Sequence, residues 1–224
     1  MSDSQASKAP ETKKLADYTP SPWVVEDVFL DVRLHPERTR VISELHVTRN
    51  AKSDQPDAPL VLDGEELELV SLALNGQRLE ESAYEKGERM LTLPSPPPEG
   101  FRLRIETLCN PKANTALSGL YLSNGVYCTQ CEAEGFRRIT YFLDRPDVLA
   151  RYKVRLEAPG KEAAVLLSNG NLVDFGGTED MRQFALWEDP FPKPSYLFAM
   201  VAGNLAAVED RFITMSGREV VLRI

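Results

Sequence analysis

The stretch WVVEDVFLDVRLHPERTRVISELHVTRN, residues 23–50, indicates the fold class. From Val28 to Leu34 every second residue is aliphatic, and the residues between them are polar or aromatic. Successive side chains of a strand point to opposite faces, so a period of two predicts a half-buried strand. The segment 35–38 contains a proline and reads as a turn, and residues 40–50 follow as a second strand. The stretch therefore predicts a β-hairpin.

The same pattern recurs along the chain, with turn residues between the segments. Asn75-Gly76 and Asn169-Gly170 are strong hairpin signals. A missing amide donor does no harm between strands, and prolines are expected there at positions 94, 96, 97, 98, 111, 190, 192 and 194. The expected strands are 67–74, 90–93, 101–108, 152–158, 164–168, 172–175, 182–188, 196–202, 210–215 and 218–224. This pattern predicts an all-β fold, a β-sandwich or saddle of mostly antiparallel strands with one short helical turn after Pro146.

Composition restricts the class of partner. The chain has 224 residues, of which 42% are hydrophobic and 27% charged, as in an ordinary globular protein. Lysine and arginine number 26 against 34 acidic residues, for a net charge of −8. Nucleic acids and anionic membranes both select clustered positive charge. We therefore expect no nucleic acid and no membrane partner.

The same sequence features bear on location. Residues 1–22 are polar and lack the apolar core of a secretory leader. The longest apolar run, residues 196–208, is shorter than the roughly 18 residues that a membrane span needs. Three cysteines, an odd number, fit reduced thiols better than a disulfide framework. A cytoplasmic location is the expectation.

Cys128 and Cys131 have the C-x-x-C spacing of thiol oxidoreductases. Such a site needs a strand before the pair and a helix after it, whose N-terminus lowers the thiol pKa. Residues 119–127 fit a strand, but Gly135 and the β-branched and aromatic residues that follow make a poor helix. The context disfavours a redox pair.

A zinc site is the second interpretation of these cysteines. Cys109, Cys128 and Cys131 with one histidine would make a Cys₃His set. Only His35 and His46 are available, both in the early hairpin, and no second C-x-x-C pair follows. Small buried hydrophobic side chains are the favoured interpretation of all three thiols, so we expect no metal in this chain.

Gln130 and Glu132 offer a third kind of chemistry in the same segment. Two residues apart on an extended chain, they share a face. An amide oxygen and a carboxylate on one face suit an ammonium group, which donates strong, charge-assisted hydrogen bonds. The alternative is that Glu132 is one surface glutamate among many, and on chemistry alone that alternative is favoured.

Three runs resemble a known family: TQCEA at residues 129–133, LDRPDV at 143–148 and DPFPKP at 189–194. With their surroundings, about residues 15–224 resemble the N-terminal domain of bacterial zinc-dependent gluzincin aminopeptidases of the aminopeptidase N type. The resemblance is densest over residues 110–205. It implies a β-saddle that packs against a catalytic domain and lends one loop to the active-site wall.

The resemblance also implies roles for particular residues. Gln130 and Glu132 would bind the free α-amine of a peptide substrate, with Gln130 also lining the specificity pocket. Asp144 and Arg145 would fix the loop through ion pairs. Cys128 and Cys131 would have no catalytic role.

The catalytic motifs of that family do not occur here. Its Gly-Ala-Met-Glu-Asn and His-Glu-x-x-His motifs, the latter a zinc-binding helix, are absent from residues 1–224. The expectation is a disordered arm at 1–14, a saddle domain at 15–205, and the first strands of a truncated catalytic domain at 206–224. No catalytic residue would lie in this chain, the ligands of the single zinc ion would lie outside it, and alone it would be inactive. The alternative is a stand-alone β-sandwich module that binds a peptide or a carbohydrate.

Overall fold

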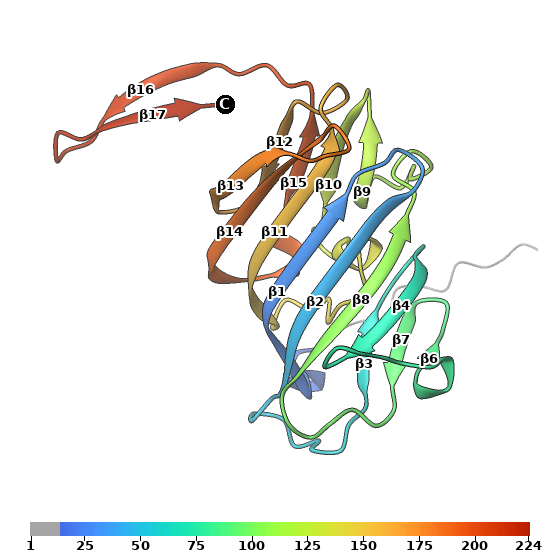
Figure 1. Cartoon of the computed structure of the whole chain (residues 1–224). Coiled ribbons are helices and arrows are strands. Elements are labelled where there is room, and N and C mark those ends of the chain that lie inside the picture. Colours follow the sequence, from blue (N-terminus) through green and yellow to red (C-terminus); the bar gives the residue numbers. More distant parts are fainter. Residues whose placement is uncertain (1–13) are drawn as a thin grey trace, which may run out of the picture.

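Eight strands form one large twisted sheet in the order β13-β14-β11-β1-β2-β8-β4-β5 (Figure 1). The computed structural model describes residues 14–224, so the arm expected at 1–14 lies, except for Lys14, outside the described residues. The strands of this sheet are β1 (Trp23–Arg33), β2 (Thr39–Arg49), β4 (Glu68–Leu74), β5 (Gln77–Arg78), β8 (Phe101–Cys109), β11 (Leu149–Pro159), β13 (Asn171–Gly177) and β14 (Arg182–Pro194).

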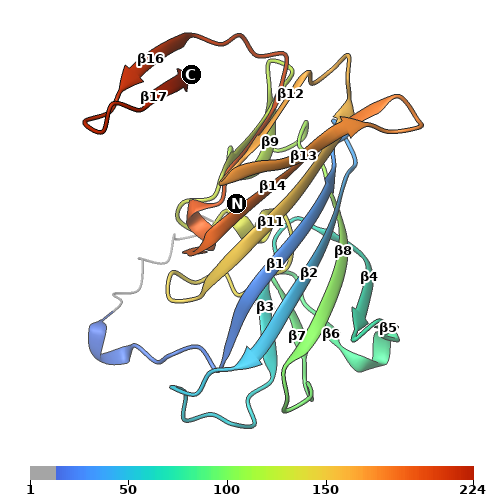
Figure 2. The same cartoon turned by 60° about the vertical axis from the view of Figure 1, so that its left-hand side comes forward.

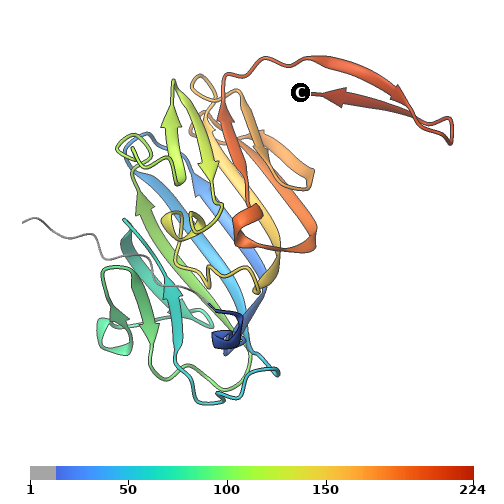
Figure 3. The ribbon, with the colours of Figure 1, turned by 180° about the vertical axis from the view of Figure 1, so that it is seen from behind.

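Two smaller sheets cover one face of the large sheet. Their orders are β12-β15-β10-β9 and β3-β7-β6, and the view from behind shows the segment between β10 and β11, in yellow, lying between them (Figure 3). Their strands are β3 (Leu60–Asp63), β6 (Glu85–Lys86), β7 (Met90–Leu93), β9 (Gly119–Ser123), β10 (Val126–Gln130), β12 (Val165–Ser168) and β15 (Met200–Gly203). The all-β sandwich predicted from the sequence is confirmed.

The core lies between the two layers. In β1 the side chains of Val28, Leu30 and Val32 are at most 2% exposed, as the period of two predicts. The opposite face of the sheet is charged, and there Arg151 and Asp27 form an ion pair at 2.8 Å across β11 and β1. Burial of one face of each strand thus holds the layers together.

The predicted turns are also present. β1 and β2 pair antiparallel as the expected hairpin. Asn75 and Gly76 both have positive φ angles, 50° and 85°, as the tight turn between β4 and β5 requires. Residues 119–127, expected as one strand, instead form most of a hairpin, β9–β10, that turns at Asn124-Gly125.

Three further features of the fold differ from the sequence prediction or add to it. β14 runs through Pro190 and Pro192, which were expected between strands; the register with β11 shifts between Ala150 and Tyr152, and this bulge needs no amide donors from the prolines. β1 and β11 pair parallel, within a sheet whose other pairs are antiparallel. The short helical turn expected after Pro146 is a single hydrogen-bonded turn, in which the amide of Val148 donates to the carbonyl of Arg145 at 3.3 Å.

Helix is otherwise confined, in residues 14–224, to four 3-10 turns: η1 (Leu15–Asp17), η2 (Glu81–Ala83), η3 (Phe136–Arg138) and η4 (Ser195–Leu197). In this part of the chain there is accordingly no helix with the length and apolar character to span a membrane. β16 (Glu209–Ile213) and β17 (Glu219–Arg223) form a separate two-stranded sheet that projects from the sandwich (Figures 1 and 2).

Candidate functional site

Gln130 and Glu132 lie where β10 ends and a tight turn begins. Gln130 is exposed, Cys131 is buried at 3% exposure, and Glu132 is exposed again. This is the alternation expected of an extended segment. Two residues that could bind a ligand therefore face solvent on either side of one that anchors the chain in the core.

The side chain of Gln130 has a defined orientation. Its Nε2 donates to the backbone carbonyl of Glu132 at 3.2 Å. Because a carbonyl can only accept, the amide nitrogen must face it, and Oε1 remains as an acceptor. With the carboxylate of Glu132, the turn presents two exposed acceptor groups. The peptide bond from Glu132 to Ala133 is cis.

Two glycines allow the turn to fold back against β9. A Cβ atom at Gly135 would lie 2.2 Å from the carbonyl oxygen of Gln130, and one at Gly119 would lie 2.6 Å from the Cβ of Arg138. The first contact is with backbone, which cannot move aside. The close approach is completed by a hydrogen bond of 2.8 Å from the amide of Gly135 to the carbonyl of Cys131.

Asp144 anchors the far side of the turn. Its side chain is fully buried, and its Oδ2 accepts from the Nε of Arg137 at 2.9 Å and from the Arg137 amide at 3.2 Å. Its Oδ1 accepts from the hydroxyl of Ser195 at 2.6 Å. Since a buried carboxylate is costly unless paired and hydrogen-bonded, these contacts account for its position.

Arg138 anchors the turn in a second direction. Its guanidinium donates to Glu65 at 2.6 Å and to Glu66 at 2.5 Å, both in the loop between β3 and β4. The Arg138 side chain is only 9% exposed, whereas that of Glu66 is 67% exposed. Neighbouring arginines thus tie the turn to two different parts of the fold.

The ion pairs expected of Asp144 and Arg145 are present, with different partners. Asp144 pairs with Arg137 and so holds the turn. Arg145 instead pairs with Asp147 at 2.8 Å and donates to the carbonyl of Thr19 at 2.9 Å, which ties the N-terminal segment. Sequence reasoning did not find Ser195, because nothing in its neighbourhood signals a contact 51 residues away.

The three cysteines are free thiols. Burial raises the pKa of Cys109 to about 12, and burial together with the charge of Asp144 raises the pKa of Cys131 to about 12. Burial also raises the pKa of the half-buried Cys128. A reactive thiol needs a lowered pKa, so this environment favours the packing role over the redox one.

The family resemblance places the zinc ligands outside this chain, and the residues that come together here are a poor zinc site. In residues 14–224 one group of three potential ligand side chains comes together, Glu26, Asp27 and His46, and it includes no cysteine. Asp27 is already engaged by Arg151. Zinc sites are built from closely set histidine, cysteine and carboxylate ligands, and this exposed group with a neighbouring arginine is a poor match.

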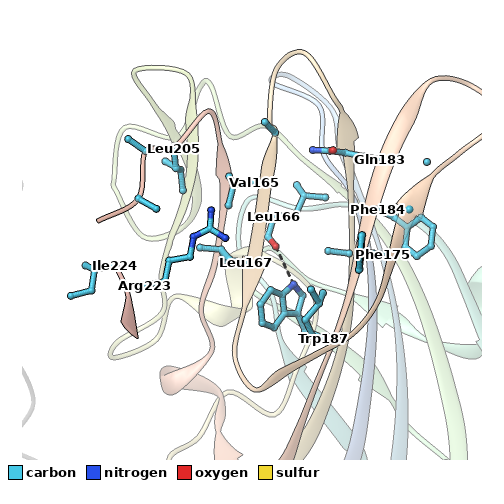
Figure 4. Close-up of a pocket in the computed structure, with 17 residues that line it drawn as sticks. Val165, Leu166, Leu167, Phe175, Gln183, Phe184, Trp187, Leu205, Arg223 and Ile224 are labelled. Atoms are coloured by element: carbon cyan, nitrogen blue, oxygen red, sulfur yellow. Dashed lines mark hydrogen bonds between the residues drawn. The ribbon is translucent and has the colours of Figure 1, made fainter. Parts of the chain in front are cut away.

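An apolar groove of about 830 Å³ lies elsewhere on the molecule. Leu166 and Leu167 of β12, Phe175 of β13 and Trp187 of β14 line it, and Ile224 lies at its edge (Figure 4). The indole of Trp187 donates to the carbonyl of Leu166 at 3.1 Å and so joins the two sheets at the groove. Gln130 and Glu132 are not among its lining residues.

Comparison with known proteins gives a consistent result. The sequence profile described as Peptidase M1 N-terminal domain matches residues 18–197. The chain is 54% identical to aminopeptidase N of Caulobacter vibrioides over 215 residues, which are 96% of this chain and 24% of that protein. It thus spans about a quarter of the length of that curated relative.

Solved structures agree. Aminopeptidase A of Legionella pneumophila, crystallised with aspartic acid, matches 94% of this chain and 25% of its own with a TM-score of 0.88 and 39% identity. An M1 zinc metallopeptidase from Deinococcus radiodurans matches 92% of this chain and 48% of its own with a TM-score of 0.72. At 20% identity, the second similarity is one of fold.

Proposed function

The chain belongs to the peptidase M1 N-terminal domain family, and we propose that it is the N-terminal part of a zinc-dependent aminopeptidase that removes N-terminal residues from peptides. In that enzyme this part caps the active site and helps to bind the free α-amine of the substrate. Gln130 and Glu132 make the contacts to the amine.

The observation that carries this proposal is the outward presentation of two acceptor groups on an anchored turn. Gln130 Oε1 and the Glu132 carboxylate are available to accept, while Arg137 and Arg138, whose side chains are 12% and 9% exposed, hold the turn through ion pairs. An α-ammonium group has three donors and a positive charge, and its hydrogen bonds to a carboxylate are of the strong, charge-assisted kind. The carboxylate of Glu132 complements the charge of the ammonium group, and Gln130 Oε1 accepts a second hydrogen bond that orients it.

In the proposed enzyme the zinc would be held by the catalytic domain, and the one candidate group in residues 14–224, Glu26, Asp27 and His46, is a poor match for zinc. The chemistry of this part is therefore binding and orientation. Holding the amine fixes the N-terminal residue of the peptide, and fixing a reactant in the right geometry lowers the barrier to its reaction. Alone, the chain is expected to be inactive.

The proposed partner of this domain within the enzyme is the catalytic domain. Residues 206–224 would be the first strands of a catalytic domain, against which the saddle packs; in support, β16 and β17 form a sheet of their own within residues 14–224. A cytoplasmic location is supported by the three free thiols. The family membership counts against a stand-alone binding module.

The test uses the full-length enzyme with Glu132→Ala and Glu132→Gln. A charged hydrogen bond contributes about 1.5 to 3 kcal/mol, so Glu132→Ala should lower kcat/KM on an aminoacyl substrate by about one to two powers of ten. Glu132→Gln keeps the shape without the charge and should recover part of that loss. Zinc content should not change. Gln130→Ala should cost less and mainly alter the preferred N-terminal residue.

The matched control is Glu134→Gln, in the same turn. The side chain of Glu134 is 57% exposed and lies 3.6 Å from Arg137. The substitution therefore removes a neighbouring carboxylate and leaves Gln130 and Glu132 unchanged. Its kcat/KM should stay near that of the wild type. A Glu132→Ala enzyme with unchanged kcat/KM would show that the amine is held elsewhere.

A further inference from the structure

The segment Ser195–Met200, which comprises η4 and the start of β15, contacts three residues near the Gln130–Glu132 pair: Thr129, Phe136 and Asp144. Ser195 donates to Asp144, which in turn holds Arg137. Phe198 packs edge-on against Phe136, with ring centroids 5.1 Å apart. Met200, the last residue of the segment, hydrogen-bonds to Thr129. Six consecutive residues thus contact the chain before, within and after the turn.

That near end is held by backbone groups. The hydroxyl of Thr129 donates to the carbonyl of Met200 at 3.1 Å and accepts from its amide at 2.9 Å. Thr129 immediately precedes Gln130, so these bonds fix the residue from which the acceptor pair projects. They extend the pairing of β10 with β15 beyond its last ladder pair, Cys128 with Val201.

We infer that Ser195 is a positioning residue: through Asp144 and Arg137 it sets the placement of the Glu132 carboxylate for the substrate amine. This rests on the function proposed above. Asp144 receives the backbone amide of Arg137 as well as its side chain, and the turn is closed internally by the bond from Gly135 to Cys131. Movement of Asp144 is therefore passed to the backbone of the turn.

Burial makes this arrangement rigid. Ser195 is 1% exposed, Phe198 3%, and the Asp144 side chain not at all. Water cannot readily replace the Ser195 hydroxyl, so its removal leaves one carboxylate oxygen short of a donor. The carboxylate must then shift toward its remaining donors on Arg137, and the turn shifts with it.

The experiment is a double-mutant cycle in the full-length enzyme, with Ser195→Ala, Glu132→Ala and the pair together. Ser195→Ala should lower kcat/KM on an aminoacyl substrate by about tenfold, and mainly through KM, because it disturbs binding of the amine. In the Glu132→Ala background the same change should cost little, since residues that act through one another are not additive. Melting temperatures establish that each variant is folded.

Ser168→Ala is the matched control. The hydroxyl of Ser168 donates to the carbonyl of Ala199 at 2.9 Å. The substitution therefore removes a serine hydrogen bond to the segment Ser195–Met200, but this bond does not reach Asp144. Its kcat/KM should be unchanged.

A second readout uses ligands in place of turnover. Leucine hydroxamate carries the α-amine, and 4-methylpentanehydroxamate is the same molecule without it. Ser195→Ala should weaken inhibition by the first about tenfold and leave the second unchanged. A variant that merely loosened the fold would weaken both alike.

Each other outcome overturns the inference. If Ser195→Ala lowers kcat/KM by the same factor in both backgrounds, or leaves kcat/KM unchanged while Glu132→Ala lowers it, positioning by Ser195 is wrong and the proposed function stands. If Glu132→Ala itself has no effect, the proposed function fails, and the inference fails with it because no bound amine remains to be positioned.

Discussion

Thr129 and Met200 exchange two hydrogen bonds through a single side-chain oxygen, which donates to the carbonyl at 3.1 Å and accepts from the amide at 2.9 Å. A hydroxyl can do both, and here it takes the place of a backbone partner where β10 leaves β15. Met200 is 2% exposed, so its backbone groups have little access to water. The side chain thus completes an otherwise interrupted ladder.

Replacing Thr129 by valine tests this. Valine keeps the shape but leaves both Met200 groups unpaired, which should lower the free energy of unfolding by about 1 to 3 kcal/mol. Thr129→Ser keeps the hydroxyl and loses one methyl group, at a cost of about 0.8 kcal/mol. Urea unfolding of the 224-residue chain measures both. Equal losses in the two variants would mean that packing, not hydrogen bonding, is what Thr129 contributes.

Arg137 should be far more important for stability than Arg145. The Arg137 side chain is 12% exposed and neutralises the fully buried Asp144, so Arg137→Met leaves a buried charge unpaired, at about 3 to 5 kcal/mol. Arg145 is 37% exposed and pairs with Asp147. Arg145→Met should cost less than about 1 kcal/mol, as surface pairs do. Similar urea midpoints for the two variants would contradict this account of the turn.

Gly135 and Gly125 are glycines for different reasons: Gly135 lies close to other backbone atoms, and Gly125 has a positive φ angle. Gly135→Ala would place a Cβ 2.2 Å from the Gln130 carbonyl oxygen, and relieving that clash should cost about 1 to 3 kcal/mol and displace the turn. Gly125 has φ near 80°, and a Cβ there meets no atom of the described residues within 4 Å. Gly125→Ala should cost about 1 to 2 kcal/mol of backbone strain only. Proteolysis near residue 132 should increase in the first variant alone.

The buried thiols predict a loss of stability in alkali. The pKa of both Cys109 and Cys131 is raised from 9.0 to about 12 by burial. Their stabilising contribution is therefore complete below pH 9 and falls above it, because the unfolded chain releases these protons first. Each thiol should lower the unfolding free energy by about 1.4 kcal/mol per pH unit between these values.

Urea unfolding at pH 8 to 11 measures this slope. Cys131→Ala should reduce the slope whatever it does to the absolute stability, while Cys128→Ala, at a half-buried site, should change it less. A free energy of unfolding that stays constant from pH 9 to 11 in the wild type would contradict the pKa shifts.

The strands themselves were largely predictable. β7 occupies residues 90–93 as predicted, and β1 and β2 agree with prediction to within a few residues. Alternation of aliphatic and polar side chains is a local property, written residue by residue in the chain. The turn at Asn75-Gly76 was predictable for the same reason, since it depends on the φ angles that those two residues allow.

The pairing of strands was less predictable. The parallel pairing of β1 with β11 joins residues about 124 positions apart, as in the bond from Arg151 to Asp27. β14 continues through Pro190 and Pro192 only because a bulge in its register with β11 removes the need for their amides. The sequence of one strand does not predict the parallel pairing or the bulge, because each depends on the partner strand.

The side chains that the site offers were predictable from the sequence. The two-residue spacing of Gln130 and Glu132 around an apolar Cys131 directs both outward, because side chains alternate along an extended chain. How these side chains are held depends on contacts between distant parts of the chain. Arg137 meets Asp144, and Asp144 meets Ser195 51 residues later, because packing of the small sheets on the large one brings these groups together. Because a buried charge is costly unless it is paired and hydrogen-bonded, Asp144 is stable at this position only with these partners.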